Sequence, residues 1–215
     1  MAKGHAVNFV DVAAPPGTGK STLCDHFHHH RWPDWDGLSP PDEWKDFLAE
    51  VNRLVALVKD HKNCFGVGTL PAVIRMNERS LKKMATVTRI NDTKPYIQTG
   101  FVQRGLGFGW RLVDMGGDLR EMKCYYELMP VSIGVAFLKA GLTTIFERNE
   151  AREKVPTTAH ENRSFQVPLM IPAIEYAKEV LAARGVRICT IDVEHQTPDQ
   201  SRKQLIEFAG RAEPS

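Results

Sequence analysis

The segment from Ala14 to Ser21 (APPGTGKS) constrains the fold more than any other part of the sequence. It has the Walker A spacing, with alanine in place of the first glycine. The apolar residues 5–13 before it predict a buried strand, and the chain from Lys20 can continue as a helix that ends before Pro33. A strand, a glycine-rich turn and a helix in this order surround an anion with backbone N–H groups. The sequence therefore predicts a phosphate-binding loop.

This loop has the residue types that bind the triphosphate of ATP together with Mg²⁺. Gly17 and Gly19 permit the backbone geometry, Lys20 can bridge the terminal phosphates as a catalytic residue, and the Ser21 hydroxyl can ligate the metal ion. ATP and Mg²⁺ are thus the expected cofactors. The residues expected to bind ATP here are Pro16, Gly17, Thr18, Gly19, Lys20, Ser21 and Thr22.

Strand and helix patterns alternate along the rest of the chain. Helices are predicted over 39–60, 71–86 and from about 172 to Gly185, and strands over 95–98, 109–113, 131–138 and 186–193. Apolar strands between helices are typical of a parallel sheet covered on both faces. The prediction is an α/β, three-layer P-loop NTPase fold with about five mostly parallel strands. Residues 1–215 would form one domain, with a small helical lid at about 143–166.

The composition favours a soluble globular protein over a disordered or membrane-spanning one. The 215 residues are 42% hydrophobic and 25% charged, and no apolar run approaches the roughly 20 residues that span a bilayer. We expect a cytoplasmic protein. The four cysteines form no CxxC pair, so buried, reduced thiols are expected.

The basic residues are unevenly spread along the chain. The formal net charge is only +2, but the segment from Arg75 to Lys94 holds six basic residues against Glu78 and Asp92. Two interpretations remain open: a solvated helix face, or a surface that contacts nucleic-acid phosphates.

Two further segments favour a small kinase over a switch GTPase or a motor ATPase. Arg148 and Arg152 are four residues apart, so they share one helix face and suit the charge on a transferring phosphoryl group. The alternative is a surface helix in which neighbouring glutamates pair with the arginines. After the last strand, the loop 192–200 is expected beside the adenine, with Thr197 and Pro198 as binding residues.

At this point the sequence resembles the adenylate-kinase-like branch of the P-loop kinases. The segment from Gly100 to Gly105 (GFVQRG) is similar to the Walker B neighbourhood of that branch. Related phage and bacterial kinases have an acidic pair before this glycine, whereas this chain has Gln98 and Thr99. The carboxylate that supports the metal must then come from elsewhere, and Asp114 is one candidate.

A more specific resemblance is to phage 5-hydroxymethyluracil DNA kinases, and it covers mainly the second half of the chain. It rests on YELMP at 126–130, the Arg148–Arg152 segment, HENRS at 160–164 and the helix that follows. The resemblance implies transfer of the γ-phosphoryl group of ATP to the 5-hydroxymethyl group of a modified thymine in phage DNA, within the host cytoplasm. Gln103, Arg104 and Arg163 are the expected contacts to this substrate.

The acceptor hydroxyl needs a carboxylate to orient it and to take its proton. Asp34 and Asp36 are the first candidates because they come just after the helix that leaves the loop. Trp32 and Trp35 could stack on an extruded base. The alternatives are a plain turn for the aspartates and core packing for the tryptophans.

Other functions remain open at the sequence level. A P-loop kinase of a free nucleotide or another small hydroxyl compound is the main alternative. A nucleotide switch is suggested by DMGG at 114–117, but the guanine-reading Asn-Lys-x-Asp motif is missing. A non-catalytic DNA-binding module is the last alternative. The sequence leaves the oligomeric state open.

Overall fold

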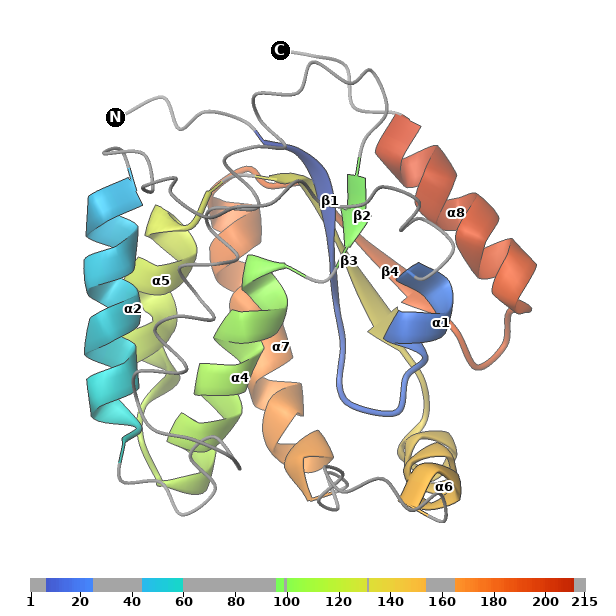
Figure 1. Ribbon diagram of the computed structural model, residues 1–215, viewed down its shortest axis with the longest axis horizontal. Coiled ribbons are helices and arrows are strands. Elements are labelled where there is room, and N and C mark those ends of the chain that lie inside the picture. Colours follow the sequence, from blue (N-terminus) through green and yellow to red (C-terminus); the bar gives the residue numbers. More distant parts are fainter. Residues whose placement is uncertain are drawn as a thin grey trace, which may run out of the picture.

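The computed structural model describes residues 7–24, 44–59, 96–98, 100–130, 132–153 and 165–210. Within these ranges the centre is a four-stranded sheet with the order β2-β1-β3-β4, and every neighbouring pair is parallel (Figure 1). The strands are β1 (Val7–Ala13), β2 (Tyr96–Gln98), β3 (Ser132–Lys139) and β4 (Ile188–Asp192).

The strand order creates a switch point between β1 and β3. The chain moves from β1 to β2 on one side and then crosses to β3 on the other side of β1. In open α/β sheets, ligands bind at the carboxyl ends of the strands where the order reverses. The segment from Ala14 to Gly19 leaves β1 at this point, so the fold positions the predicted phosphate-binding loop there.

Helices cover both faces of the sheet and give three layers (Figure 1). α4 and α7 lie on one face, with α2 and α5 beyond them, and α1 and α8 lie on the other face. α6 follows β3 at the carboxyl end of the sheet. The helices are α1 (Lys20–Cys24), α2 (Lys45–Leu57), α4 (Phe101–Asp114), α5 (Lys123–Leu128), α6 (Leu142–Glu153), α7 (Gln166–Ala183) and α8 (Pro198–Gly210), with a 3₁₀ turn at Leu119–Met122.

Two apolar clusters lie on the two sides of the sheet. Along β1 the side chains alternate between them: Val10 and Val12 pack with α1 and α8, whereas Ala13 packs with the helices of the other face. Successive residues of a strand point to opposite faces, so a strand buried on both sides needs a continuous apolar run. Asp11 interrupts this run and is fully buried.

Most of the predicted elements are confirmed, and the three-layer α/β fold is as expected. The predicted helix 39–60 contains α2, whose Phe47, Val51 and Leu54 are buried as their spacing indicates. The predicted helix 71–86 lies outside the described residues. The described part of the sheet has four strands, against about five predicted.

The strand predicted at 109–113 is wrong, because these residues belong to α4. The helix was missed because Gly105, Gly107 and Gly109 lower its helix propensity. Two of these glycines permit close packing instead. A Cβ at Gly105 would lie 2.8 Å from Tyr125 and Tyr126, and one at Gly109 would lie 2.8 Å from Ala173 of α7.

Two further expectations concern the burial of the cysteines and the absence of membrane-spanning segments. Cys24 is buried and Cys189 is partly buried, but Cys124 is exposed, so the expectation that all the cysteines are buried is wrong. Cys124 is the second residue of the short helix α5 and lies on its solvent-exposed side. Among the described residues, no helix has the length and apolarity needed to cross a bilayer.

Candidate functional site

The loop after β1 has the backbone geometry that its glycines predict. Gly17 and Gly19 have φ angles of 89° and 92°, a region that favours glycine because it has no Cβ. The first hydrogen bond of α1 runs from Leu23 N to Gly19 O at 3.0 Å. The N–H groups in the first turn of a helix have no acceptor within the helix itself, so an anion can accept hydrogen bonds at this end.

Lys20 folds back over the start of the loop. Its Nζ donates hydrogen bonds to Ala14 O at 2.7 Å and to Pro15 O at 2.9 Å. The Thr18 hydroxyl, which is buried, donates to Pro15 O at 2.8 Å. The loop is thus held closed by two of its own side chains, and the ammonium group lies beside it.

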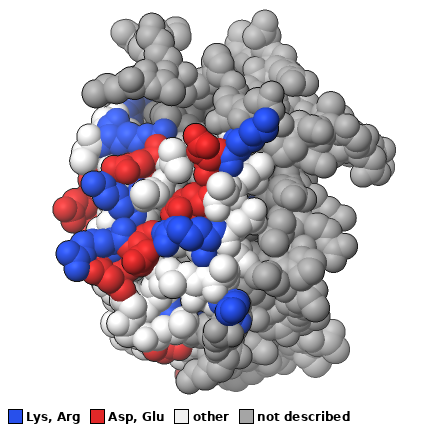
Figure 2. Space-filling view, turned by 90° about the vertical axis from the view of Figure 1, so that its left-hand side faces the viewer, with Lys and Arg blue, Asp and Glu red and all other residues white. Residues whose placement is uncertain are grey.

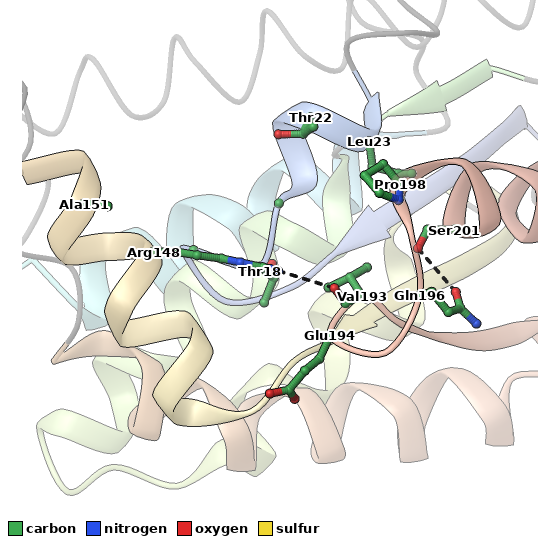
Figure 3. Close-up of a pocket in the computed structure, with 12 residues that line it drawn as sticks. Thr18, Thr22, Leu23, Arg148, Ala151, Val193, Glu194, Gln196, Pro198 and Ser201 are labelled. Carbon is green, nitrogen blue, oxygen red and sulfur yellow. Dashed lines mark hydrogen bonds between the residues drawn. The ribbon is translucent and has the colours of Figure 1, made fainter.

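A cavity of about 360 Å³ adjoins this loop (Figure 3). It is bounded by the loop and α1 on one side, by α6 on another, and by the segment from β4 into α8. Its volume lies within the ordinary range for small-molecule sites. The lining residues are Gly17, Thr18, Gly19, Thr22, Leu23, Arg148, Ala151, Val193, Glu194, Gln196, Pro198 and Ser201.

Arg148 reaches the cavity from α6. Its Nη2 lies 3.5 Å from Val193 O, a long hydrogen bond to the turn after β4 (Figure 3). The guanidinium group therefore lies between the phosphate-binding loop and that turn. Arg152 is one helical turn further along α6, and its side chain lies outside the described part of the structure.

Asn149 joins α6 to the phosphate-binding loop, a role that sequence reasoning missed. Its side chain is buried, and its Nδ2 lies 3.5 Å from Pro16 O. A Cβ at Gly17 would lie 2.7 Å from Asn149 Oδ1. The available signal was a single uncharged amide inside the charged segment RNEAR.

Thr197 and Pro198, both expected beside the adenine, have different surroundings. Pro198 lines the cavity. The Thr197 hydroxyl accepts from Gln200 N at 3.3 Å, and Gln200 Oε1 accepts from Thr197 N at 2.8 Å. This reciprocal pair is a capping box, with proline at the first helical position of α8. The sequence TPDQ was therefore a helix-start signal as well.

α4 starts beside the loop, and Gln103 connects the two. Gln103 Oε1 accepts a hydrogen bond from Ala14 N at 2.9 Å. Its side chain, expected to contact the acceptor, therefore holds the first residue of the phosphate-binding loop.

Asp11, which sequence reasoning also missed, anchors the same end of α4. Its two carboxylate oxygens accept from Gly100 N and Val102 N, each at 2.8 Å. Burial raises the pKa of Asp11 to about 6, although these N–H donors and Arg104 oppose the rise. Arg104 is partly buried, and its desolvation lowers its pKa, although Tyr125 and Asp11 favour its charged form. The signal for Asp11 was an acid inside an otherwise apolar strand.

The structure does not bring Asp114 to the phosphate-binding loop, so its expected role at the metal is not supported. Asp114 ends α4, whose first turn lies beside the loop. A helix of 14 residues is about 20 Å long at about 1.5 Å per residue. Asp114 is exposed at the far end.

The described residues fit Mg²⁺ only in part. Ser21 is exposed in the first turn of α1, where its hydroxyl could ligate a metal ion bound to phosphates. Mg²⁺ in such sites is held by few protein ligands together with substrate phosphates and water. Asp11, the buried carboxylate of β1, is engaged with α4, because each of its oxygens accepts a backbone N–H group there.

The predicted acceptor side lies outside the described residues. This applies to Asp34 and Asp36, to Trp32 and Trp35, to Arg163, and to the basic segment 75–94. Their roles stay predictions.

Comparison with known proteins places this geometry in a known fold. No family model matches the chain, and no curated protein matches it in sequence. A solved structure of deoxyadenosine kinase from M. mycoides with bound dATP aligns with a TM-score of 0.52 at 10% identity, over 94% of this chain and 98% of the other. The same enzyme with bound dCTP aligns at 0.44 and 9% identity, over the same shares.

The chain has an α/β fold similar to that of this deoxyadenosine kinase. At this low identity the likeness concerns the fold, and the predicted three-layer architecture agrees with it. The hydroxymethyluracil kinase resemblance was drawn from sequence motifs, and the structural comparisons do not extend to it.

Proposed function

We propose that this protein is a kinase that transfers the γ-phosphoryl group of ATP to a hydroxyl group. One observation carries the proposal: the cavity of about 360 Å³ is lined at one end by Gly17 and Gly19 and elsewhere by Arg148 of α6. A nucleotide with its base in this cavity would extend its phosphates toward the loop. Arg148 would then lie close to the transferring group.

Different residues would bind the phosphates, the metal ion and the base of the nucleotide. The glycines, Lys20 and the start of α1 would hold the phosphates, and Ser21 would hold Mg²⁺. Leu23, Val193 and Pro198 give the cavity apolar walls against which a base can pack. Arg148 would stabilise the charge that develops on the phosphoryl group. A carboxylate, Asp34 or Asp36, would accept the proton of the acceptor hydroxyl.

For the acceptor, we propose the 5-hydroxymethyl group of 5-hydroxymethyluracil in DNA, on the strength of the motifs at 126–130, 148–152 and 160–164. DNA binding needs a surface of predominantly positive charge. The face over α2 and α5 mixes both signs (Figure 2). On this face Arg53 forms ion pairs with Glu50 and Glu121, and the two carboxylates offset the positive charge of the arginine. We therefore assign the DNA contacts to the basic segment 75–94.

Calorimetry with Mg²⁺-ATP, followed by a transfer assay with radiolabelled ATP, tests the proposal. The wild type should bind ATP and release ADP in the presence of acceptor, and Lys20→Ala should fold normally and transfer nothing. Absence of heat with any nucleoside triphosphate from well-folded protein would refute the kinase function.

The acceptor is tested in parallel arms. One arm uses a duplex that contains 5-hydroxymethyluracil, a second uses the same duplex with thymine, and a third uses the free nucleoside and nucleotide. Transfer to the first arm alone supports the DNA substrate. Transfer to the third arm alone would instead assign the protein as a kinase of a small hydroxyl compound.

A further inference from the structure

Glu194 makes two short contacts that link distant parts of the chain. Its Oε2 accepts a hydrogen bond from Gly141 N at 2.6 Å, and its Oε1 accepts from the Thr144 hydroxyl at 2.6 Å. These bonds span 53 and 50 residues. The bond from Thr144, followed by the bond from Gly141 N, lowers the pKa of Glu194, so the carboxylate is ionised near neutral pH.

The contacts make Glu194 the cap of α6. The first N–H groups of a helix need acceptors, which a side chain at the cap position usually supplies, and negative charge is favourable there. Gly141, just before Leu142, has no side chain to do this. A Cβ at Gly141 would lie 2.9 Å from Glu194 Oε2, so the close approach of the carboxylate needs a glycine.

The turn that carries Glu194 is itself fixed. Asp192 Oδ1 accepts from Glu194 N at 3.1 Å and from His195 N at 3.2 Å, and Asp192 Oδ2 lies 3.0 Å from His195 Nδ1. Val193 N donates to Lys139 O at 2.9 Å, which ties the turn to the end of β3. These hydrogen bonds hold the turn in one conformation, so Glu194 can cap a helix elsewhere in the chain.

The same turn meets α6 a second time, about one helical turn beyond Thr144, where Arg148 approaches Val193 O. Glu194 and Val193 line the cavity together with Arg148 (Figure 3). Thr144 and Gly141 do not belong to the lining. The turn thus contacts both the cavity and the helix that presents the arginine.

We propose that Glu194 is a positioning residue: it joins the turn at 192–195 to the start of α6 and so holds Arg148 at the cavity beside the loop. This inference rests on the proposed function in assigning the cavity to a nucleotide. Contacts between the base and the turn would then favour the placement of α6 that brings Arg148 to the phosphates. Binding of the base by the turn and binding of the phosphates by Arg148 would therefore reinforce each other.

The first test needs no nucleotide. Glu194→Ala and Thr144→Val should each accelerate amide hydrogen exchange in the first turn of α6 by about fivefold or more, in line with the loss of a helix cap. Glu147→Ala, an exposed position on the same helix, is the matched control and should leave exchange in this turn unchanged. Melting temperatures should stay within about 2 °C of the wild type. Unchanged exchange in both variants would overturn the cap.

The second test measures ATP affinity by calorimetry. Glu194→Ala and Thr144→Val should each weaken ATP binding, by about tenfold and about threefold, and the double variant should be no weaker than Glu194→Ala alone. Because Thr144 lies outside the cavity lining, its effect must act through Glu194 and α6. A Thr144→Val variant with wild-type affinity beside a weakened Glu194→Ala would mean direct contact between Glu194 and the nucleotide, and would overturn the proposal.

The two tests separate this inference from the proposed function. A wild type that binds no ATP refutes the proposed function and the nucleotide half of this inference, whereas the exchange experiment still decides whether Glu194 positions α6. A wild type that binds ATP, with multiplicative effects of the two substitutions, refutes the coupling alone.

Discussion

Asn149 Oδ1 lies so close to Gly17 that a Cβ on the glycine would be 2.7 Å from it, and 2.9 Å from the carbonyl oxygen of Ile145. Helix α6 is therefore pressed against the backbone of the phosphate-binding loop. Both contacts depend on residue 17 having no side chain. Residue 17 must therefore be glycine for two reasons: the contact with α6 leaves no room for a Cβ, and the backbone has a positive φ.

We expect Gly17→Ala to weaken ATP binding more than Gly19→Ala does. Both glycines have positive φ, so each alanine brings backbone strain of about 1–3 kcal/mol. Only at position 17 does the added methyl group also collide with α6, whereas nothing lies within 4 Å of a Cβ at position 19. Calorimetric titration with Mg²⁺-ATP measures the difference, which should reach about tenfold, or about 1.4 kcal/mol. Equal losses in both variants would mean that α6 does not press on the loop.

Under the proposed function, Arg148→Ala should lower the rate of phosphoryl transfer by about 10³, because its guanidinium group would stabilise the transition state. Arg148→Lys should recover little of it, since a lysine lacks the planar fork. The KM for the acceptor should not change. Arg120→Ala is the control: this arginine is 84% exposed in the 3₁₀ turn beyond the far end of α4. Steady-state kinetics in both substrates provides the test, and a rate equal to that of the control would contradict the role.

Gly105→Ala and Gly107→Ala should change stability in opposite directions, although both replace a glycine within α4. At position 105 the methyl group would lie 2.8 Å from the rings of Tyr125 and Tyr126, and overpacking of this kind costs about 1–3 kcal/mol. At position 107 the nearest atom is 3.7 Å away, so the better helix propensity of alanine should stabilise by about 0.5–1 kcal/mol. Urea denaturation of both variants gives the two signs. A stabilised Gly105→Ala would contradict the close packing of α5 on α4.

Asp11→Asn should remove a dependence of stability on pH. Burial raises the pKa of Asp11 to about 6 in the folded protein, above its ordinary value of 3.8, so the folded state binds this proton more readily. The group therefore favours folding most at low pH, and this advantage is lost as pH rises from about 4 to about 6. Across this window the wild type should lose on the order of 3 kcal/mol relative to the variant. Urea denaturation at several pH values measures it, and a pH-independent difference between the two proteins would argue against a buried, neutralised Asp11.

Elements with a strong local pattern were predictable from the sequence. The strand at β1, the glycine turn and the helix start at Lys20 follow each other directly, so local rules were sufficient. The stripe of Phe47, Val51 and Leu54 also marked α2, because its apolar spacing is helical. α4 was not predictable in this way, since its three glycines oppose helix formation. Two of them, Gly105 and Gly109, are explained only by the tyrosine rings of α5 and by Ala173 of α7, which pack against them.

The sequence by itself determined the strand, glycine-rich turn and helix at residues 7–24 and the alternation of strands and helices, because both are set by residues that are neighbours along the chain. Only the tertiary structure decided which side chains surround the loop. Asn149 meets Pro16 across 133 residues, Gln103 meets Ala14 across 89, and Glu194 meets Gly141 across 53. No local pattern encodes such pairs, because they form only when the parallel sheet brings the carboxyl ends of its strands to one edge.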